Sequence, residues 1–310
     1  MRWLPTNTDT FARPRTIGRR GEIFMTELRK IETGQSLVFD ALVGGAVDAP
    51  LVLLLHGFAE SLHTWRSTVP ALATAGYRAI APSQRGYSPG ARPNPADTAK
   101  YNFDLLVADA MNVVAACGHA SRRFHLVGHD WGGSIAWGLA DRYPDRIASL
   151  TVLSRPHPNA FNRALQLPDG DQAHRSRHHK AFLELDAGPL LLADGARRLR
   201  ERLHRSGVPA AAIEEHIAVL GNEPTMEAAL AWYRARGAIR APLGMISVPV
   251  LYVWGDADDT VGHAAAQGTR AFVSGSYQFE ILPGVGHFIA DQSPDRLNEL
   301  LLAHIAKHPA

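Results

Sequence analysis

One hexapeptide, Gly128 to Gly133 (GHDWGG), constrains the fold more than any other stretch of this chain. It follows the apolar run Phe124 to Val127 and opens a segment that is compatible with a helix. A glycine-x-nucleophile-x-glycine pattern between a strand and a helix is typical of a sharp elbow that lifts one side chain clear of a sheet. The residue at the apex is Asp130 rather than serine or cysteine. The sequence therefore predicts a reactive carboxylate on a strand-turn-helix elbow.

Strand and helix patterns alternate around this hexapeptide, from residue 51 to residue 154. Leu51 to Leu55 is apolar throughout, as expected for a parallel strand that is covered on both faces, and Ile147 to Leu153 is a second candidate of this kind. Asp104 to Ala116 has the apolar spacing of a helix. Residues 25–32 and 36–43 suit a hairpin at the sheet edge. The alternation predicts an α/β fold with a mostly parallel, doubly wound sheet.

The strand pattern disappears between residue 155 and about residue 240. Helix-like segments replace it at residues 181–192, 196–203 and 210–220. Strand patterns return at Pro249 to Val253 and at Tyr277 to Leu282, and Leu297 to Ile305 fits a closing helix. We therefore expect four parts, namely a mobile N-terminal arm (1–24), a first part of the α/β core (25–154), an inserted helical cap domain (155–240) and a second part of the core (241–310).

The composition argues against several classes of partner. The net charge is only +2, and no long block of lysine or arginine is present, so neither nucleic acid nor an anionic membrane is indicated. Cys117 is the only cysteine and cannot form an internal disulfide. No apolar run approaches the roughly 20 residues of a membrane helix. A cytoplasmic location and a small-molecule substrate follow as expectations, while the choice between monomer and homodimer stays open.

Three polar sites stand directly after predicted strands, where open α/β sheets place their ligands. They are Asp130, the loop Trp254 to Asp259, and the loop Gly284 to Phe288 that contains His287. The chain order is nucleophile, acid and histidine, which is the order of a catalytic triad on a doubly wound sheet. All three together, with His56-Gly57 after another strand, make a much stronger signal than the elbow alone.

The sequence resembles the α/β-hydrolase superfamily, and within it the branch of epoxide hydrolases and haloalkane dehalogenases, whose nucleophile is an aspartate. The resemblance covers nearly the whole chain from about Met25 onward. Residues 56–61 (HGFAES) look like the epoxide hydrolase motif His-Gly-x-Pro-Glu-Ser with Ala59 in place of proline. Gly128 to Gly133 and Trp232 to Arg234 look like the elbow and the cap tyrosine motif of the same enzymes. The resemblance implies the α/β-hydrolase fold with an inserted helical cap.

An aspartate at the apex also has a chemical reason that is independent of the resemblance. A serine that attacks an sp³ carbon would form an ether, which water does not readily cleave, whereas a carboxylate forms an ester. Water can then attack the ester carbonyl while backbone N–H groups hold the oxyanion. Asp130 therefore suits alkyl transfer from an epoxide or a halide.

The resemblance assigns the remaining parts of the core site. His287 is expected to be the base that activates the water, and a carboxylate is expected to fix its tautomer. Asp258 is chosen because it matches a Gly-x-x-Asp motif counted from Gly255, with Asp256 and Asp259 left as alternatives. The backbone N–H groups of Phe58 and Trp131 are the expected oxyanion donors, and their side chains are expected to line the substrate pocket.

Epoxide opening also needs a hydrogen-bond donor at the departing oxygen. Epoxide hydrolases supply two cap tyrosines, and Tyr233 matches one of them. No tyrosine lies between Tyr143 and Tyr233, so the second donor is expected to be His179, or His178 if the register differs by one. Adjacent histidines do not have the helical spacing of a metal site, and neither a metal nor a cofactor is expected.

Three functions are compatible with these residues. Hydrolysis of an epoxide to a vicinal diol is the leading hypothesis. Dehalogenation by the same aspartyl ester is the second, although Phe58 stands where haloalkane dehalogenases carry asparagine, and Trp131 and Ser134 stand where fluoroacetate dehalogenases carry arginines. The indole N–H of Trp131 would then be the donor to the halide. The third is a binding protein that keeps the fold without turnover.

Overall fold

The computed structural model describes residues 15–17, 23–235 and 242–310. Strands β3 to β10 form one eight-stranded sheet, and β1 pairs with β2 in a separate two-stranded sheet. The bounds of the strands are β1 (Arg15–Ile17), β2 (Ile23–Met25), β3 (Glu27–Glu32), β4 (Val38–Gly44), β5 (Leu51–Leu55), β6 (Arg78–Pro82), β7 (Phe124–His129), β8 (Ile147–Leu153), β9 (Val250–Gly255) and β10 (Tyr277–Leu282).

The large sheet confirms the predicted α/β fold. Its strand order is β10-β9-β8-β7-β5-β6-β4-β3, and all neighbours from β10 to β6 are parallel. The expected hairpin is present as β3 and β4, which pair antiparallel with Glu32 opposite Val38. β4 also runs antiparallel to β6, so the hairpin ends the sheet at one edge.

Helices cover both faces of this sheet, which explains why β5 is apolar at every position. Leu51, Leu53 and Leu55 pack with the helices that follow β6 and β7, whereas Val52 and Leu54 pack with α1 and α12 on the opposite face. The bounds of the helices are α1 (Thr68–Thr74), α2 (Phe103–Val114), α3 (Asp130–Arg142), α4 (Pro158–Leu165), α5 (Gln172–Arg175), α6 (His178–Ala181), α7 (Ala187–Arg205), α8 (Ala210–Leu220), α9 (Glu223–Arg234), α10 (His263–Gly268), α11 (Ile289–Gln292) and α12 (Pro294–Ala306).

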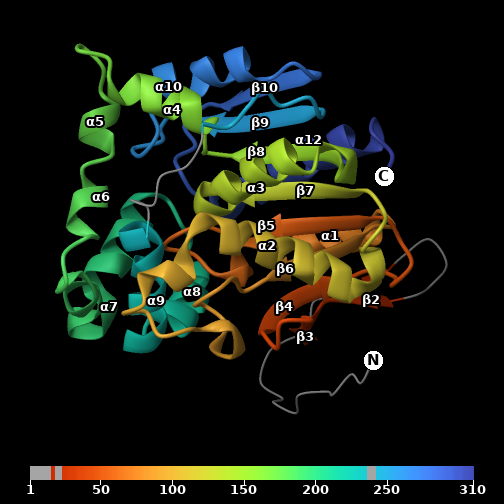
Figure 1. Cartoon of the computed structure of the whole chain (residues 1–310), viewed down its shortest axis with the longest axis horizontal. Coiled ribbons are helices and arrows are strands. Elements are labelled where there is room, and N and C mark those ends of the chain that lie inside the picture. Colours follow the sequence, from red (N-terminus) through yellow and green to blue (C-terminus); the bar gives the residue numbers. More distant parts are fainter. Residues whose placement is uncertain (1–14, 18–22, 236–241) are drawn as a thin grey trace.

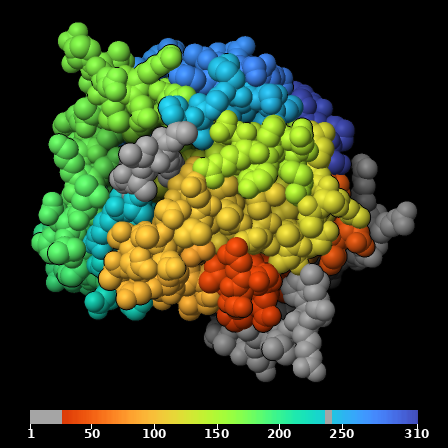
Figure 2. Space-filling model, in the orientation of Figure 1, coloured from red at the N-terminus to blue at the C-terminus, as the bar shows by residue number. Residues whose placement is uncertain are grey.

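Helices α4 to α9 lie between β8 and β9 in the chain, and no strand interrupts them within the described residues 154–235. We call this stretch the helical insertion. Figure 1 shows most of it stacked at one end of the sheet, away from the labelled N and C termini. In Figure 2 its green and cyan residues meet the orange residues of the core as one continuous surface in that view.

The helix expected at residues 181–192 begins later than the sequence pattern indicates. Phe182 to Asp186 forms turns, and α7 starts at Ala187. Pro189 supplies a physical reason, because proline is tolerated in the first turn of a helix but clashes with the preceding turn in a helix interior. The expected break between residues 192 and 196 is present, since Ala193 to Ala196 leave helical geometry inside α7.

Two of the sequence predictions lie largely outside the described residues. The mobile arm was expected over residues 1–24, of which only 15–17 and 23–24 are described, as parts of β1 and β2. The expected boundary between the insertion and the second part of the core, at residues 240 and 241, also lies outside them. In the described part of the chain, no helix combines the length and the apolar character that spanning a bilayer requires.

Candidate active site

The elbow after β7 has the geometry that its glycines predict. Asp130 is the first residue of α3 and has a φ of 48°, in the left-handed region that few side chains other than asparagine and aspartate adopt. A Cβ atom on Gly132 would lie 2.1 Å from the carbonyl oxygen of Leu55, and one on Gly128 would lie 2.4 Å from the carbonyl oxygen of Gly132. Glycine is therefore required at both positions for α3 to approach β5 closely enough to present Asp130.

Different groups face the two oxygens of the Asp130 carboxylate. The backbone N–H of Phe58 donates to Oδ1 at 3.1 Å, and His287 Nε2 lies 3.9 Å from Oδ2. Burial by itself would raise the pKa of Asp130, but His287, His129, Arg155 and the Phe58 N–H outweigh it and lower the pKa to about 2. Asp130 is thus an ionised carboxylate at neutral pH, with one oxygen held and the other facing a histidine.

A hydrogen bond from the acid loop orients His287. Its Nδ1 donates to Asp258 Oδ2 at 2.9 Å, so the neutral imidazole carries no proton on Nε2. The other oxygen of Asp258 accepts from the backbone N–H groups of Thr260 and Val261. The two alternative aspartates face elsewhere, since Asp256 accepts from the Gly284 N–H and Asp259 pairs with Arg202. Asp258 is therefore the acid of this loop whose carboxylate contacts His287, and it leaves Nε2 free to accept a proton.

His129, beside Asp130, is held as a cation by two acceptors. Its Nδ1 donates to Glu60 Oε2 at 2.6 Å, and its Nε2 donates to the carbonyl oxygen of His287 at 2.9 Å. Two acceptors require a proton on both nitrogens. Burial lowers the pKa of His129, but the fully buried Glu60 outweighs it and raises the pKa to about 9. The positive charge of His129 helps to keep Asp130 ionised. The hydrogen bond from its Nε2 connects the elbow to the loop that contains His287.

Buried histidines give the stability of this protein an optimum in pH. Burial lowers the pKa values of His56, His125 and His157 from 6.5 to about 4, so these side chains are neutral when folded. Each binds a proton on unfolding between pH 4 and 6.5, and stability is therefore lost as the pH falls through this window. The contribution of His129 has the opposite sign, because its folded pKa is raised. It is complete below pH 6.5 and is lost as the pH rises through about 9.

We expect the free energy of unfolding to decline on both sides of neutral pH, as measured by urea denaturation. Glu60→Gln removes the cause of the raised pKa of His129, so the alkaline decline between pH 6.5 and 9 should flatten in this variant. Glu227→Gln is the matched control, because Glu227 pairs with Arg234 and with no histidine, and its alkaline decline should match the wild type. An unchanged alkaline decline in Glu60→Gln would contradict the assignment.

A cavity of about 220 Å³ lies above the elbow, and Asp130 and His287 are in its wall. The helical insertion supplies Tyr233 and His178 to the same wall, and β5 is followed by Phe58, which also lines it. Tyr233 is buried, and its ring meets the Phe58 ring edge-on with centroids 5.6 Å apart. The predicted nucleophile, base and cap tyrosine, which come from three distant parts of the sequence, therefore share one cavity.

The two adjacent histidines of α6 differ in their positions. His178 lines the cavity, whereas His179 is absent from its described lining and instead has its ring 5.7 Å from that of Tyr233. The Nδ1 of His178 donates to the carbonyl oxygen of Arg175 at 3.0 Å. Burial, together with Arg202, lowers the pKa of His178 to about 4, so its Nε2 is an unprotonated acceptor at neutral pH. In this arrangement His178 can accept a hydrogen bond from a ligand but does not donate one.

Trp131 is absent from the described lining of the cavity. Its side chain is buried and packs edge-on against Trp232 and Tyr233, with ring centroids 5.6 and 5.2 Å away. The ring of Tyr233 therefore packs against the Trp131 ring of the elbow. The sequence expectation for Phe58 matches the cavity, whereas the side chain of Trp131 supports the tyrosine instead of lining the pocket.

Within the described residues, one buried group has the composition of a metal site. Glu60, His216 and Asp291 have potential ligand atoms within 4.8 Å of one another. Both nitrogens of His216 already contact protein partners, Ser61 Oγ at 3.1 Å and Asp291 Oδ2 at 3.0 Å, and Asp291 also accepts from Arg66 at 2.6 Å. This network joins the loop after β5 to α8 and α11, while Glu60 Oε1 is buried without a hydrogen-bond partner in the described part of the chain.

Sequence reasoning did not assign roles to several residues of the site. The motif that contains Glu60 does not indicate that this carboxylate accepts a hydrogen bond from His129, and no motif indicates that Arg198, Arg202 and Arg205 line the cavity. Their spacing of four and three residues on a helix was a readable signal, because it places them on one face. Which way that face points depends on how α7 packs on the core, and the sequence does not contain that information.

Comparisons with known proteins agree with this geometry. The family described as "alpha/beta hydrolase fold" matches residues 50–294. The chain is similar to epoxide hydrolase A of Mycobacterium tuberculosis, with 31% identity over 301 residues that cover 83% of this chain and 91% of that protein. It is also similar to epoxide hydrolase 3 of Xenopus tropicalis, with 28% identity over 85% of this chain and 73% of that protein. A solved structure from a study of novel epoxide hydrolases in metagenomes from hot environments has a TM-score of 0.80 and 26% identity, and it covers 91% of this chain and 99% of that chain.

Proposed function

We propose that this protein opens an epoxide to a vicinal diol. The premise is that the chain belongs to the α/β-hydrolase family and is similar to members of it that are named epoxide hydrolases. The observation that carries the proposal is the set of contacts around Asp130. One oxygen accepts from the Phe58 N–H, the other faces His287 Nε2 at 3.9 Å, and Tyr233 shares the cavity. We also propose that the helical insertion acts as the cap of this cavity.

In the first step, Asp130 Oδ2 attacks an epoxide carbon and the carbon–oxygen bond of the ring breaks. The electron pair of that bond stays on the departing oxygen, which takes a proton from the hydroxyl of Tyr233. The held oxygen, Oδ1, becomes the carbonyl oxygen of the new ester. The product of this step is a hydroxyalkyl ester on Asp130.

In the second step, His287 removes a proton from water through Nε2, and the water oxygen attacks the ester carbonyl carbon. The negative charge that develops on Oδ1 is stabilised by the Phe58 N–H, which already contacts this atom at 3.1 Å. Asp258 stabilises the imidazolium that forms, because its carboxylate is 2.9 Å from Nδ1. The ester then breaks, and its alkyl oxygen, which came from Asp130, takes the proton of the His287 imidazolium and leaves as a hydroxyl of the diol. The water oxygen stays on Asp130, and the proton that it still carries returns to the Tyr233 oxygen, which restores the carboxylate and the phenol.

Tyr233→Phe should lower kcat/KM for an aryl epoxide by about 10²-fold, the usual contribution of a positioned general acid. Tyr252→Phe is the matched control, because Tyr252 is buried in β9, its hydroxyl has no hydrogen-bond partner in the described structure, and it does not line the cavity. Turnover should be compared by diol formation. Equal effects of the two substitutions would remove Tyr233 from the mechanism.

The indole of Trp131 is one candidate halide donor for the dehalogenase alternative. Because this indole packs against Trp232 and Tyr233 outside the described cavity lining, no observation favours halide release over epoxide opening. We expect little chloride release from a panel of chlorinated alkanes under conditions in which styrene-oxide-type epoxides give diols. Chloride release that exceeds diol formation would reverse this assignment.

A further inference from the structure

The wall of the cavity that faces solvent carries a row of arginines from α7. Arg198, Arg202 and Arg205 are separated by four and three residues and so lie on one face of the helix. All three line the cavity that contains Asp130 and His287. Apolar residues of the same wall, among them Leu199 and Phe182, lie with them. A pocket for a purely apolar epoxide has no need of three guanidinium groups.

The three arginines differ in how their charges are compensated. Arg202 donates to Asp259 Oδ1 at 3.1 Å and to Thr260 Oγ1 at 3.2 Å. The side chains of Arg198 and Arg205 form no hydrogen bond or ion pair with any residue in the described ranges 15–17, 23–235 and 242–310. Two cationic groups at the cavity are therefore unpaired.

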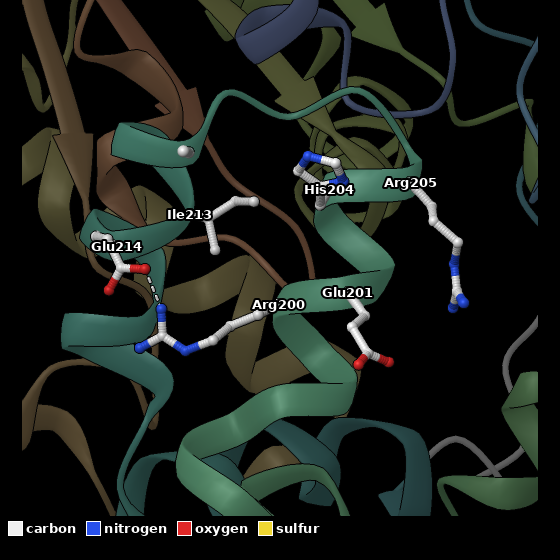
Figure 3. Close-up of a pocket in the computed structure, with 7 residues that line it drawn as sticks. Arg200, Glu201, His204, Arg205, Ile213 and Glu214 are labelled. Carbon is white, nitrogen blue, oxygen red and sulfur yellow. Dashed lines mark hydrogen bonds and ion pairs between the residues drawn. The ribbon is translucent and has the colours of Figure 1, made fainter.

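The two arginines of α7 that do not line this cavity, Arg197 and Arg200, both have acidic partners. Arg197 contacts Asp194 and Glu201, and Arg200 contacts Glu214 on α8. Figure 3 shows the Arg200–Glu214 pair at a second cavity, between α7 and α8, whose lining also includes Arg205; the side chain of Arg205 extends away from that pair. Among the residues that the structure describes, acidic partners are thus supplied along this helix except at Arg198 and Arg205.

The charged side chains that line the cavity would be neutralised by one additional negative charge. Among the ionisable side chains that line it, Asp130 is the anion, and Arg202 is neutralised by Asp259. Arg198 and Arg205 then exceed Asp130 by one positive charge. A monoanion such as a carboxylate would restore neutrality, and guanidinium groups bind carboxylates with charge-assisted hydrogen bonds.

We propose that the substrate is an epoxide that carries a carboxylate, which Arg198 and Arg205 bind while the epoxide carbon faces Asp130. This inference rests on the proposed function. The cavity volume of about 220 Å³ restricts the substrate to a compact molecule. Because both arginines are exposed to solvent, the interaction is screened by salt.

The first experiment compares terminal epoxides of hexanoate and of hexanamide, which differ in charge and hardly in size. The wild type should show kcat/KM higher by about tenfold for the carboxylate, and this preference should shrink at high salt. Arg198→Gln and Arg205→Gln should each reduce the preference, and the double variant should abolish it. Arg197→Gln is the matched control on the same helix, and its preference should equal that of the wild type.

The second experiment separates this inference from the proposed function by measuring binding without chemistry. Hexanoate and hexanamide are titrated into the wild type and the double variant by calorimetry. Tighter binding of hexanoate that is lost in the double variant supports the anion site, even if no epoxide is turned over. Equal affinities for the two ligands overturn it, even if neutral epoxides are hydrolysed. A preference of glycidyl phosphate over the carboxylate epoxide would overturn the choice of a monoanion.

Discussion

Asp130→Asn is expected to lower kcat for epoxide hydrolysis by at least about 10⁴-fold, because an amide is a poor nucleophile and removal of a covalent nucleophile has effects of this order. Asparagine is the appropriate replacement, since Asp130 has a φ of 48° and asparagine tolerates this backbone geometry better than alanine. Its side chain also keeps an oxygen that can accept from the Phe58 N–H. The loss should therefore reflect chemistry rather than a distorted elbow.

The measurement is diol formation under saturating epoxide, with circular dichroism to verify folding. Asp256→Asn is the matched control, because Asp256 accepts from the Gly284 N–H and does not contact His287. It should retain activity within about twofold, as expected for a substitution away from the site. Activity lost equally in both variants would indicate a structural effect on the loops instead of a nucleophile at Asp130.

Isotope labelling tests the covalent route directly. In a single turnover in ¹⁸O-labelled water with the enzyme in excess, the label should appear in the peptide that contains Asp130 and not in the diol. This follows because the diol takes its second oxygen from the carboxylate and the water oxygen replaces it. Label in the first-turnover diol would mean that water attacks the epoxide itself, and this result would contradict the proposed aspartyl ester.

His287→Gln should stop the reaction after its first step and accumulate the ester. Formation of the ester uses Asp130 and Tyr233, whereas its hydrolysis needs the base whose Nε2 lies 3.9 Å from Asp130 Oδ2. Glutamine can still donate to Asp258 but does not act as a base. We expect a loss of steady-state turnover of roughly 10³-fold or more, because the residues of a triad act as a unit.

Mass spectrometry of the intact variant after addition of an epoxide measures this trapping. The mass should increase by that of one epoxide, and the adduct should lie on the peptide with Asp130. The double variant Asp130→Asn with His287→Gln is the control and should show no adduct. An adduct on another residue, or full turnover by His287→Gln, would refute the proposed roles.

The sequence predicted the fold well where local patterns and burial agree. The apolar run Leu51 to Leu55 became β5, and Ile147 to Leu153 became β8 with the expected bounds. These strands are covered on both faces, so their composition alone reveals their environment. The start of α7 was predicted too early, because apolar spacing continues through Phe182 to Asp186 while Pro189 limits the helix. A cytoplasmic location, the oligomeric state and the absence of a cofactor stay predictions.

The candidate site was predictable to the extent that each residue follows a strand. Asp130 and His287 stand at such positions, and the elbow glycines indicate why Asp130 is presented. The choice of Asp258 over its neighbours came from a motif, since three aspartates in one turn have similar local signals. Only the fold shows that Asp258 Oδ2 lies 2.9 Å from His287 Nδ1.

The residues of the helical insertion were the least predictable. His178 and His179 are adjacent, and a shift of one residue on a helix rotates a side chain by about 100°. The sequence pattern favoured His179, whereas the folded chain places His178 in the described cavity wall and turns its donor toward the Arg175 carbonyl. For the same reason, the sequence did not indicate that Arg198 and Arg205 face the cavity.

The sequence by itself determined the α/β fold, the carboxylate at the elbow and the chain order of Asp130, the aspartate loop after β9 and His287, because short-range patterns encode strands, tight turns and the chemistry of individual side chains. The tertiary structure decided which groups meet. These contacts set the charge of His129 and the acceptor state of His178, and they place in the cavity wall two arginines that are unpaired within the described residues. These properties arise from contacts between segments far apart in the chain. The protonation and pairing of a side chain depend on the atoms around it, which only the folded chain specifies.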